Sequence, residues 1–121
     1  MKAGVASGMI VAEPDNGVSI ECVALDDVVD GEVHLCKLDV EGHEPQVIAG
    51  MKKIIERSRP ILVTEMNAYW LKKIGSSIDD YSQLLHALDY RLLDIDRQFE
   101  AFGDFDRNNP LCNINVLALP N

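Results

Sequence analysis

Three acidic residues stand where two apolar segments of the sequence end. Asp39 and Glu41 lie at the end of the apolar run 33–40, and Glu65 lies near the end of a second run that begins at Ile61. If these runs are neighbouring parallel strands, their carboxyl ends meet at one edge of a sheet, and Asp39 and Glu65 face one crevice. Paired carboxylates in such a crevice could position a polar substrate, bind a cation, or share a proton as acid and base.

Two other interpretations of the same residues stay open at the level of sequence. Glu41 and Glu44 could simply favour the positive end of a helix that follows them. Together with His43 and Asp39 they could instead bind a metal ion, because hard cations prefer carboxylate oxygens and softer ones accept imidazole. A single histidine in a turn is more often a surface residue than a ligand, so the sequence predicts no metal site.

The segments that must position these residues alternate between strand and helix. Residues 33–40 and 61–66 are almost continuously apolar, as strands buried on both faces of a parallel sheet are. The apolar positions between them have the spacing of one amphipathic helix over 45–58. The remaining elements follow in the order helix, strand, loop and strand, at 78–89, 91–95, 96–110 and 112–119.

This order predicts an α/β domain with a mostly parallel sheet. Because strand–helix–strand crossovers are right-handed, both helices should cover the same face of that sheet. The last two strands are joined by a loop, so we expect an antiparallel pair at one end. At the start of the chain, Met9–Ala12 and residues 18–24 could form a hairpin across Asn16-Gly17. Residues 1–121 are thus expected to form one domain, a hairpin-like lead-in over 1–24 and an α/β core over 33–121.

Composition excludes several classes of partner. The 121 residues suffice for one hydrophobic core, and 20 acidic against 11 basic residues give a net charge of −9, which disfavours nucleic acid and anionic membranes. No apolar stretch approaches the roughly 20 residues of a membrane span, and the first residues are not typical of a secretory signal. The three cysteines are odd in number and lack a C-x-x-C spacing, which is typical of reduced structural thiols in a cytoplasmic protein.

Four segments carry a resemblance to a known family. They occur in the order and with the spacing of that family's characteristic sequence motifs, which are roughly L-D-[DE], K-[IL]-D-[VI]-E-G-x-E, V-[LI]-x-G and P-x-[IL]-x-x-E. The chain resembles the FkbM-type methyltransferases over about residues 18–66. The matching segments are Leu25-Asp26-Asp27, Lys37-Leu38-Asp39-Val40-Glu41-Gly42-His43-Glu44, Val47-Ile48-Ala49-Gly50 and Arg59-Pro60-Ile61-Leu62-Val63-Thr64-Glu65.

The resemblance implies a fold and an activity. The fold is the Rossmann-like sheet of class I methyltransferases, and the activity is methyl transfer from S-adenosylmethionine to a hydroxyl oxygen of a small acceptor such as a sugar or lipid. Asp39 and Glu41 would then lie beside methyl donor and acceptor, and Glu65 would line the acceptor side. These three are the candidate catalytic residues. Their neighbours Lys37, His43, Glu44 and Asn67 are the candidates for contacts with the acceptor.

The sequence departs from this family at its beginning. The family's cofactor loop, a D-x-G-x-N-x-G or similar glycine pattern, does not occur in residues 1–17. We therefore expect the C-terminal half of the fold, truncated and inactive alone, which does not bind S-adenosylmethionine by itself. The expected partners are a second copy in a homodimer or a missing N-terminal half. The alternatives are a non-catalytic binding or assembly module and a carboxylate-based, metal-dependent enzyme.

Overall fold

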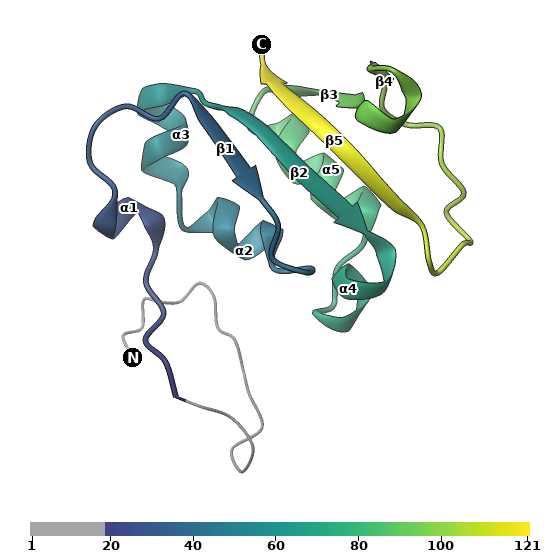
Figure 1. Cartoon of the computed structure of the whole chain (residues 1–121), viewed down its shortest axis with the longest axis horizontal. Coiled ribbons are helices and arrows are strands. Elements are labelled where there is room, and N and C mark those ends of the chain that lie inside the picture. Colours follow the sequence, from purple (N-terminus) through teal and green to yellow (C-terminus); the bar gives the residue numbers. More distant parts are fainter. Residues whose placement is uncertain (1–18) are drawn as a thin grey trace.

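The computed structural model describes residues 19–121, and within them five strands form one sheet (Figure 1). The strand order is β1-β2-β5-β3-β4, so β1 and β4 are the edges. β1 and β2 are parallel, and Leu35 lies beside Ile61 in their register. The strands are β1 (Leu35–Leu38), β2 (Ile61–Asn67), β3 (Tyr90–Asp94), β4 (Glu100–Ala101) and β5 (Asn113–Pro120).

All α-helices of the described chain except the short α1 belong to the two connections between strands, and α2, α3 and α5 lie behind the sheet in Figure 1. The crossover from β1 to β2 contains α2 and α3, and the longer connection from β2 to β3 contains α4 and α5. The helices are α1 (Leu25–Val28), α2 (Glu44–Ala49), α3 (Lys52–Ser58), α4 (Ala68–Lys73) and α5 (Ile78–Ala87), and a 3-10 turn covers Ile95–Arg97. The mixed α/β class predicted from the sequence is confirmed.

The last strand enters the middle of the sheet. β5 pairs antiparallel with β2 on one side and with β3 on the other. The expected antiparallel pair of the last two long strands is therefore present, but β5 separates β2 from β3 instead of lying beyond them. In the described part of the chain only β1 and β2 are directly paired parallel strands, so the expectation of a mostly parallel sheet is wrong: β5 enters antiparallel between β2 and β3, and β3 and β4 are also antiparallel.

The hydrophobic core lies between the helices and one face of the sheet. Along β2 the residues Leu62, Thr64 and Met66 are buried, whereas Ile61 is 37% exposed. α2 and α3 contribute Ile48, Ile54 and Ile55 to the same core cluster as Tyr81 and Leu85 of α5. Both crossovers thus cover the same face, as the handedness rule predicts.

The other face of the sheet carries no helix in the described chain. We call it the open face; it presents, among others, Lys37, Ile61, Val63, Glu65, Asn115 and Leu117. The expectation that residues 33–40 form a strand buried on both faces is therefore wrong. β1 is shorter than that run, and its Leu35 is 63% exposed. A continuous apolar run does not reveal whether a second layer is present to cover it.

The predicted lead-in hairpin is not formed where the structure describes it. Residues 19–24 have no strand, whereas Met9–Ala12 and the Asn16-Gly17 turn lie outside the described residues. The segment instead leads directly into α1, and the Asp26 N–H donates to the Gly50 carbonyl at 2.9 Å.

The single helix expected over 45–58 is two helices, because the chain breaks at Gly50 and Met51. Asp26 causes the second start: its carboxylate accepts from the backbone N–H groups of Lys53 and Ile54, at 2.9 and 3.0 Å. Those N–H groups lack a partner within a helix that begins at Lys52. Gly50 packs against Ala24, where an added Cβ would lie 3.3 Å from the Ala24 Cβ.

Two helix starts in the second connection depend on side-chain caps. Asn67 accepts from the backbone N–H groups of Tyr69 and Trp70 and begins α4, a helix that lies between the predicted strand over 61–66 and the predicted helix over 78–89. Ser77 accepts from the N–H of Asp80 at the start of α5, as its sequence pattern predicts. No helix among residues 19–121 is long and apolar enough to cross a membrane.

Candidate functional site

A shallow hollow brings the predicted acidic pair together. Asp39, just beyond the carboxyl end of β1, and Glu65, near the carboxyl end of β2, both line a cavity of about 110 Å³ on the open face. Lys37 and Asn115 line the same hollow, and Lys37 Nζ lies 4.0 Å from a carboxylate oxygen of Asp39. The side chains of Lys37 and Asp39 are largely exposed, so a ligand could reach them from solvent.

The turn after β1 has a backbone that its glycine makes possible. Gly42 has φ +96, and an added Cβ would lie 2.5 Å from the carbonyl oxygen of Trp70 in α4. Glu41 before it has φ 50, a left-handed conformation, and is exposed. The turn is thus held against α4, and Glu41 is presented to solvent at the same end of the sheet as Asp39.

Glu44 holds this turn from inside. It is 1% exposed, and its two carboxylate oxygens accept from the N–H groups of Val40, at 3.1 Å, and Gly42, at 2.9 Å. Both oxygens are therefore used by the turn that carries Glu41. A direct contact between Glu44 and a substrate stays a prediction, and this burial disfavours it; the observed geometry is that of a positioning residue.

A buried hydroxyl pair lies on the helix side of the sheet beneath this edge. Tyr81 of α5 and Thr64 of β2 share a hydrogen bond of 2.9 Å between their hydroxyl oxygens. Burial raises the pKa of Tyr81 above its ordinary value, and the negative charge of Glu44 raises it further, against the opposite effect of the bond to Thr64. Tyr81 therefore remains a neutral hydroxyl and fixes the strand that carries Glu65.

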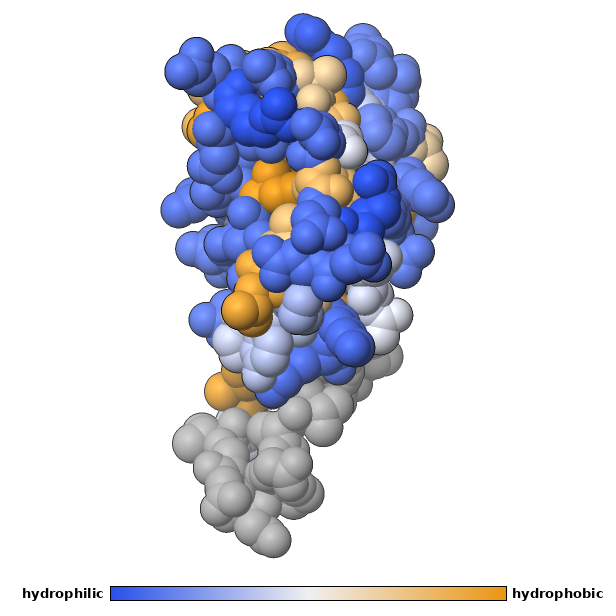
Figure 2. All heavy atoms as spheres, turned by 90° about the vertical axis from the view of Figure 1, so that its right-hand side faces the viewer, coloured by the Kyte–Doolittle hydropathy of each residue, from blue (hydrophilic) through white to orange (hydrophobic). Residues whose placement is uncertain are grey.

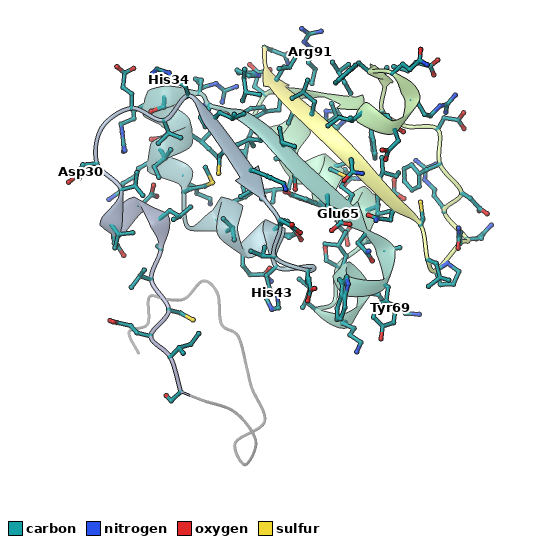
Figure 3. The ribbon with its side chains drawn as sticks, in the orientation of Figure 1. Asp30, His34, His43, Glu65, Tyr69 and Arg91 are labelled. Atoms are coloured by element: carbon teal, nitrogen blue, oxygen red, sulfur yellow. The ribbon has the colours of Figure 1, made fainter. Side chains whose placement is uncertain are left out.

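The remaining predicted contact residues lie apart from the hollow. His43 lies below α2, away from Glu65, and lines a different cavity along β1 (Figure 3). Asn67 is committed through its side-chain oxygen to the cap of α4. Their contact with an acceptor remains a prediction. His34 lies at the opposite end of β1 from His43, so it is not part of this site (Figure 3).

Asn115 is the polar side chain of the hollow that sequence reasoning missed. Asn115 comes from β5, fifty residues after Glu65 in the chain, and pairs with Glu65 in the strand register. Its backbone N–H and side-chain amide both donate to Asp96. A signal was present: Asn113 and Asn115 are polar positions in an apolar strand and so mark one face. The neighbour of that face could not be known without the position of β5.

Two larger cavities lie elsewhere on the described chain. One, of about 540 Å³, runs along β1 between α2 and residues 22–25 and has mostly apolar walls. The other, of about 470 Å³, lies between the start of α5 and the loop 105–112. Its walls contain an ion pair between Arg107 Nε and the Asp79 carboxylate at 3.0 Å.

Metal and thiol chemistry receive no geometric support among the described residues. Within 19–121, no three histidine, cysteine or acidic side chains gather as a metal site would need. The three cysteines are unpaired thiols. Burial raises the pKa of Cys36 and of Cys112, and the charges of Asp106 and Asp94 raise that of Cys112 further. These two thiols are consequently poor nucleophiles near neutral pH.

Comparison with known proteins gives one match. The family model described as Methyltransferase FkbM domain matches residues 3–92, which is about three quarters of the chain. No curated protein and no solved structure matches the chain. The matched range contains Asp39, Glu41 and Glu65, and it ends within β3.

Proposed function

Because the chain belongs to the FkbM methyltransferase family, we propose that it forms the acceptor side of an O-methyltransferase that acts on a small hydroxylated molecule such as a sugar or lipid headgroup. The observation that carries this proposal is the shared hollow of Asp39 and Glu65 at the carboxyl ends of two adjacent parallel strands. Ligands of open α/β sheets bind at that edge. The crossovers and the inserted β5 agree with the C-terminal half of a Rossmann-like methyltransferase sheet.

The family implies S-adenosylmethionine as methyl donor, but the described residues do not fit this cofactor. The hollow of about 110 Å³ is too small for a nucleoside with an attached amino acid. The cavity along β1 is larger, but no carboxylate lines it that could bind ribose hydroxyls or a cationic amino group. The cofactor-binding elements are therefore proposed to lie outside residues 19–121.

The proposed chemistry of the hollow is orientation and proton removal. Asp39 and Glu65 accept hydrogen bonds from the acceptor's hydroxyl groups, and Lys37 supplies a donor at the rim. One of the two carboxylates accepts a hydrogen bond from the reacting hydroxyl group and is placed to take its proton. Orientation supplies most of the rate, since methyl transfer needs little covalent help from the protein. Glu44 and Tyr81 position the two strand ends without touching the acceptor.

Two-dimensional amide NMR during titration with methyl glucoside or inositol tests the proposal. Millimolar ligand should shift the amides of Asp39, Glu65 and Asn115, and the double variant Asp39→Asn/Glu65→Gln should lose these shifts. The control Asp79→Asn changes a carboxylate in the separate cavity beside α5 and should leave them unchanged. Shifts that gather around Asp79, or that survive in the double variant, would contradict the proposed acceptor site.

A second candidate function is a non-catalytic binding module derived from the same fold. The absence of a fitting cofactor cavity among residues 19–121 favours it. Titration calorimetry with S-adenosylmethionine distinguishes both candidate functions, the acceptor side of a methyltransferase and the binding module, from an enzyme that binds its cofactor without another chain. We expect no stoichiometric binding by the isolated chain, and a low-micromolar dissociation constant would contradict both. Carbohydrate binding without methyl transfer, even when a cofactor-binding half is supplied, would favour the binding module.

A further inference from the structure

The outer edge of β1 has no partner strand among residues 19–121. The N–H of Ile61 donates to the carbonyl of His34, which shows that the backbone groups of His34 point toward β2. Consecutive residues of a strand turn their backbone groups to opposite sides. The backbone groups of Leu35, Lys37 and Asp39 therefore point to the free edge, where another strand can pair with them.

The cavity of about 540 Å³ runs beside this edge on the helix side. Its walls include Val23, Leu25, Leu38, Val40 and Val47, and both Val23 and Val40 are exposed. The buried Oε1 atom of Gln46, in the same wall, has no hydrogen-bond partner in the described chain. Unpaired backbone, exposed apolar walls and an unpartnered buried acceptor together indicate that a further chain segment belongs here.

The opposite edge of the sheet differs in character. There Arg97 forms ion pairs with Glu100 and Asp104, at 3.1 and 2.6 Å, and the surface on this side is mostly hydrophilic (Figure 2). β4 is only two residues long. Short and charged edges of this kind resist pairing. Strand addition is therefore specific to β1.

We propose that the occupant is β1 of a second copy, paired antiparallel across a two-fold axis at Leu38. The sequence of β1 selects this register. Two antiparallel copies of β1 can form backbone hydrogen bonds only where the opposed residues of both copies point to the free edge. A two-fold axis at Cys36, Lys37 or Leu38 meets this condition. An axis at Lys37 places two lysines opposite each other, and an axis at Cys36 leaves Asp39 unpaired.

The axis at Leu38 instead places each Lys37 opposite the Asp39 of the other copy. Lys37 already lies 4.0 Å from its own Asp39, so four charges of alternating sign gather on the open face. On the other face the axis passes beside Leu38, which is already buried in the core of its own chain. Opposite charges directly across an antiparallel pair are stabilising, and like charges are destabilising. The edge is thus complementary to itself in charge.

Sedimentation equilibrium at tens of micromolar tests this dimer, which should have twice the 13.4 kDa mass of the chain. Lys37→Asp places like charges across the axis and should weaken the dimer about tenfold, since two cross-strand pairs change from attraction to repulsion. The swapped variant Lys37→Asp/Asp39→Lys should restore the original dissociation constant. Both side chains are more than 60% exposed, so these changes leave the core intact.

Arg91→Asp is the matched control, because it makes the same charge reversal at an exposed site of β3. It should leave the dimer unchanged. A monomer at these concentrations overturns the proposal and indicates that the edge is filled by the chain's own residues or by another protein. Equal weakening by Lys37→Asp and Arg91→Asp overturns pairing through β1, and failure of the swapped variant overturns the register. Because Lys37 and Asp39 also line the hollow, these variants are expected to weaken acceptor binding as well, so the dimer is judged from the measured mass alone.

Discussion

The turn that presents Glu41 depends on a carboxylate that is itself out of reach of solvent. Glu44 is 1% exposed and accepts from two backbone N–H groups of residues 40–42. Hydrogen bonds to a charged group contribute about 1.5–3 kcal/mol each, and a buried partner left without one costs a similar amount. The acidic motif after β1 therefore contains two kinds of carboxylate: exposed groups available for chemistry and a buried one that shapes the backbone.

Glu44→Gln should lower the free energy of unfolding by about 1–3 kcal/mol, because the amide can accept only one of the two bonds. Glu41→Gln removes a charge from an exposed neighbour and should change stability by less than about 0.5 kcal/mol. Urea unfolding measures both variants. Equal effects would mean that the bonds to Val40 and Gly42 do not stabilise the turn.

Tyr81 should make the protein sensitive to alkaline pH. Its pKa is raised by burial, so the folded state keeps the phenol proton longer than the unfolded chain does. A raised folded pKa gives stability that is complete below the unfolded value of about 10 and declines as pH rises above it. Burial also raises the pKa of Tyr90, which adds to the same decline.

Tyr81→Phe should therefore flatten the loss of stability between about pH 9 and 11 while costing about 1 kcal/mol at neutral pH through the lost bond to Thr64. Urea unfolding across this pH range measures both effects. Tyr69→Phe, at an exposed ring of α4, is the control. An alkaline decline as steep in Tyr81→Phe as in the parent would show that this phenol does not contribute to it.

At the scale of elements, the start of α3 is set by a residue more than twenty positions earlier. Asp26→Ala should cost about 0.5–2 kcal/mol, the range for loss of a helix N-cap, because Lys53 and Ile54 lose their acceptors. Asp27→Ala, at the exposed neighbouring position, should cost less than about 0.5 kcal/mol. Hydrogen exchange of the Lys53 and Ile54 amides gives the local measurement. Unchanged protection of these two amides in Asp26→Ala would contradict the cap.

The elements also show what a sequence can predict and what it cannot. Local patterns predicted β2 and α5 correctly, since the period of the hydrophobic residues is set within a few positions of the chain. The break between α2 and α3 was missed because its cause, Asp26, is remote in sequence. Asn115 was missed for the same reason, since the insertion of β5 beside β2 is a long-range pairing.

The acidic pair itself was predictable because it needed only one assumption, that β1 and β2 are neighbours. The parallel register of Leu35 with Ile61 meets that assumption. The roles of Glu44 and Asn67 were not predictable, because a motif does not distinguish a carboxylate or amide that faces solvent from one consumed by backbone N–H groups. Three-dimensional burial is what separates them.

At the scale of the whole molecule, the described chain is a sheet with helices on one side only. Adjacent residues of β2 show this asymmetry most directly: Leu62 has no exposed surface, whereas Ile61 is 37% exposed on the open face. Both are large aliphatic residues in the same strand, with the same local geometry. The difference in their environment is the presence or absence of a helix layer.

Leu62→Ala should lower the free energy of unfolding by about 2–5 kcal/mol, because it leaves a cavity among the buried side chains beneath α2, α3 and α5. Ile61→Ala should lower it by less than about 1 kcal/mol, since the open face has little packing to lose. Urea unfolding at two protein concentrations, one below and one above the dissociation constant of the proposed dimer, measures this contrast. Pairing through the edge of β1 leaves Ile61 uncovered, so its small effect should be the same at both concentrations. A cost for Ile61→Ala that grows with protein concentration would show that copies cover the open face and associate through it.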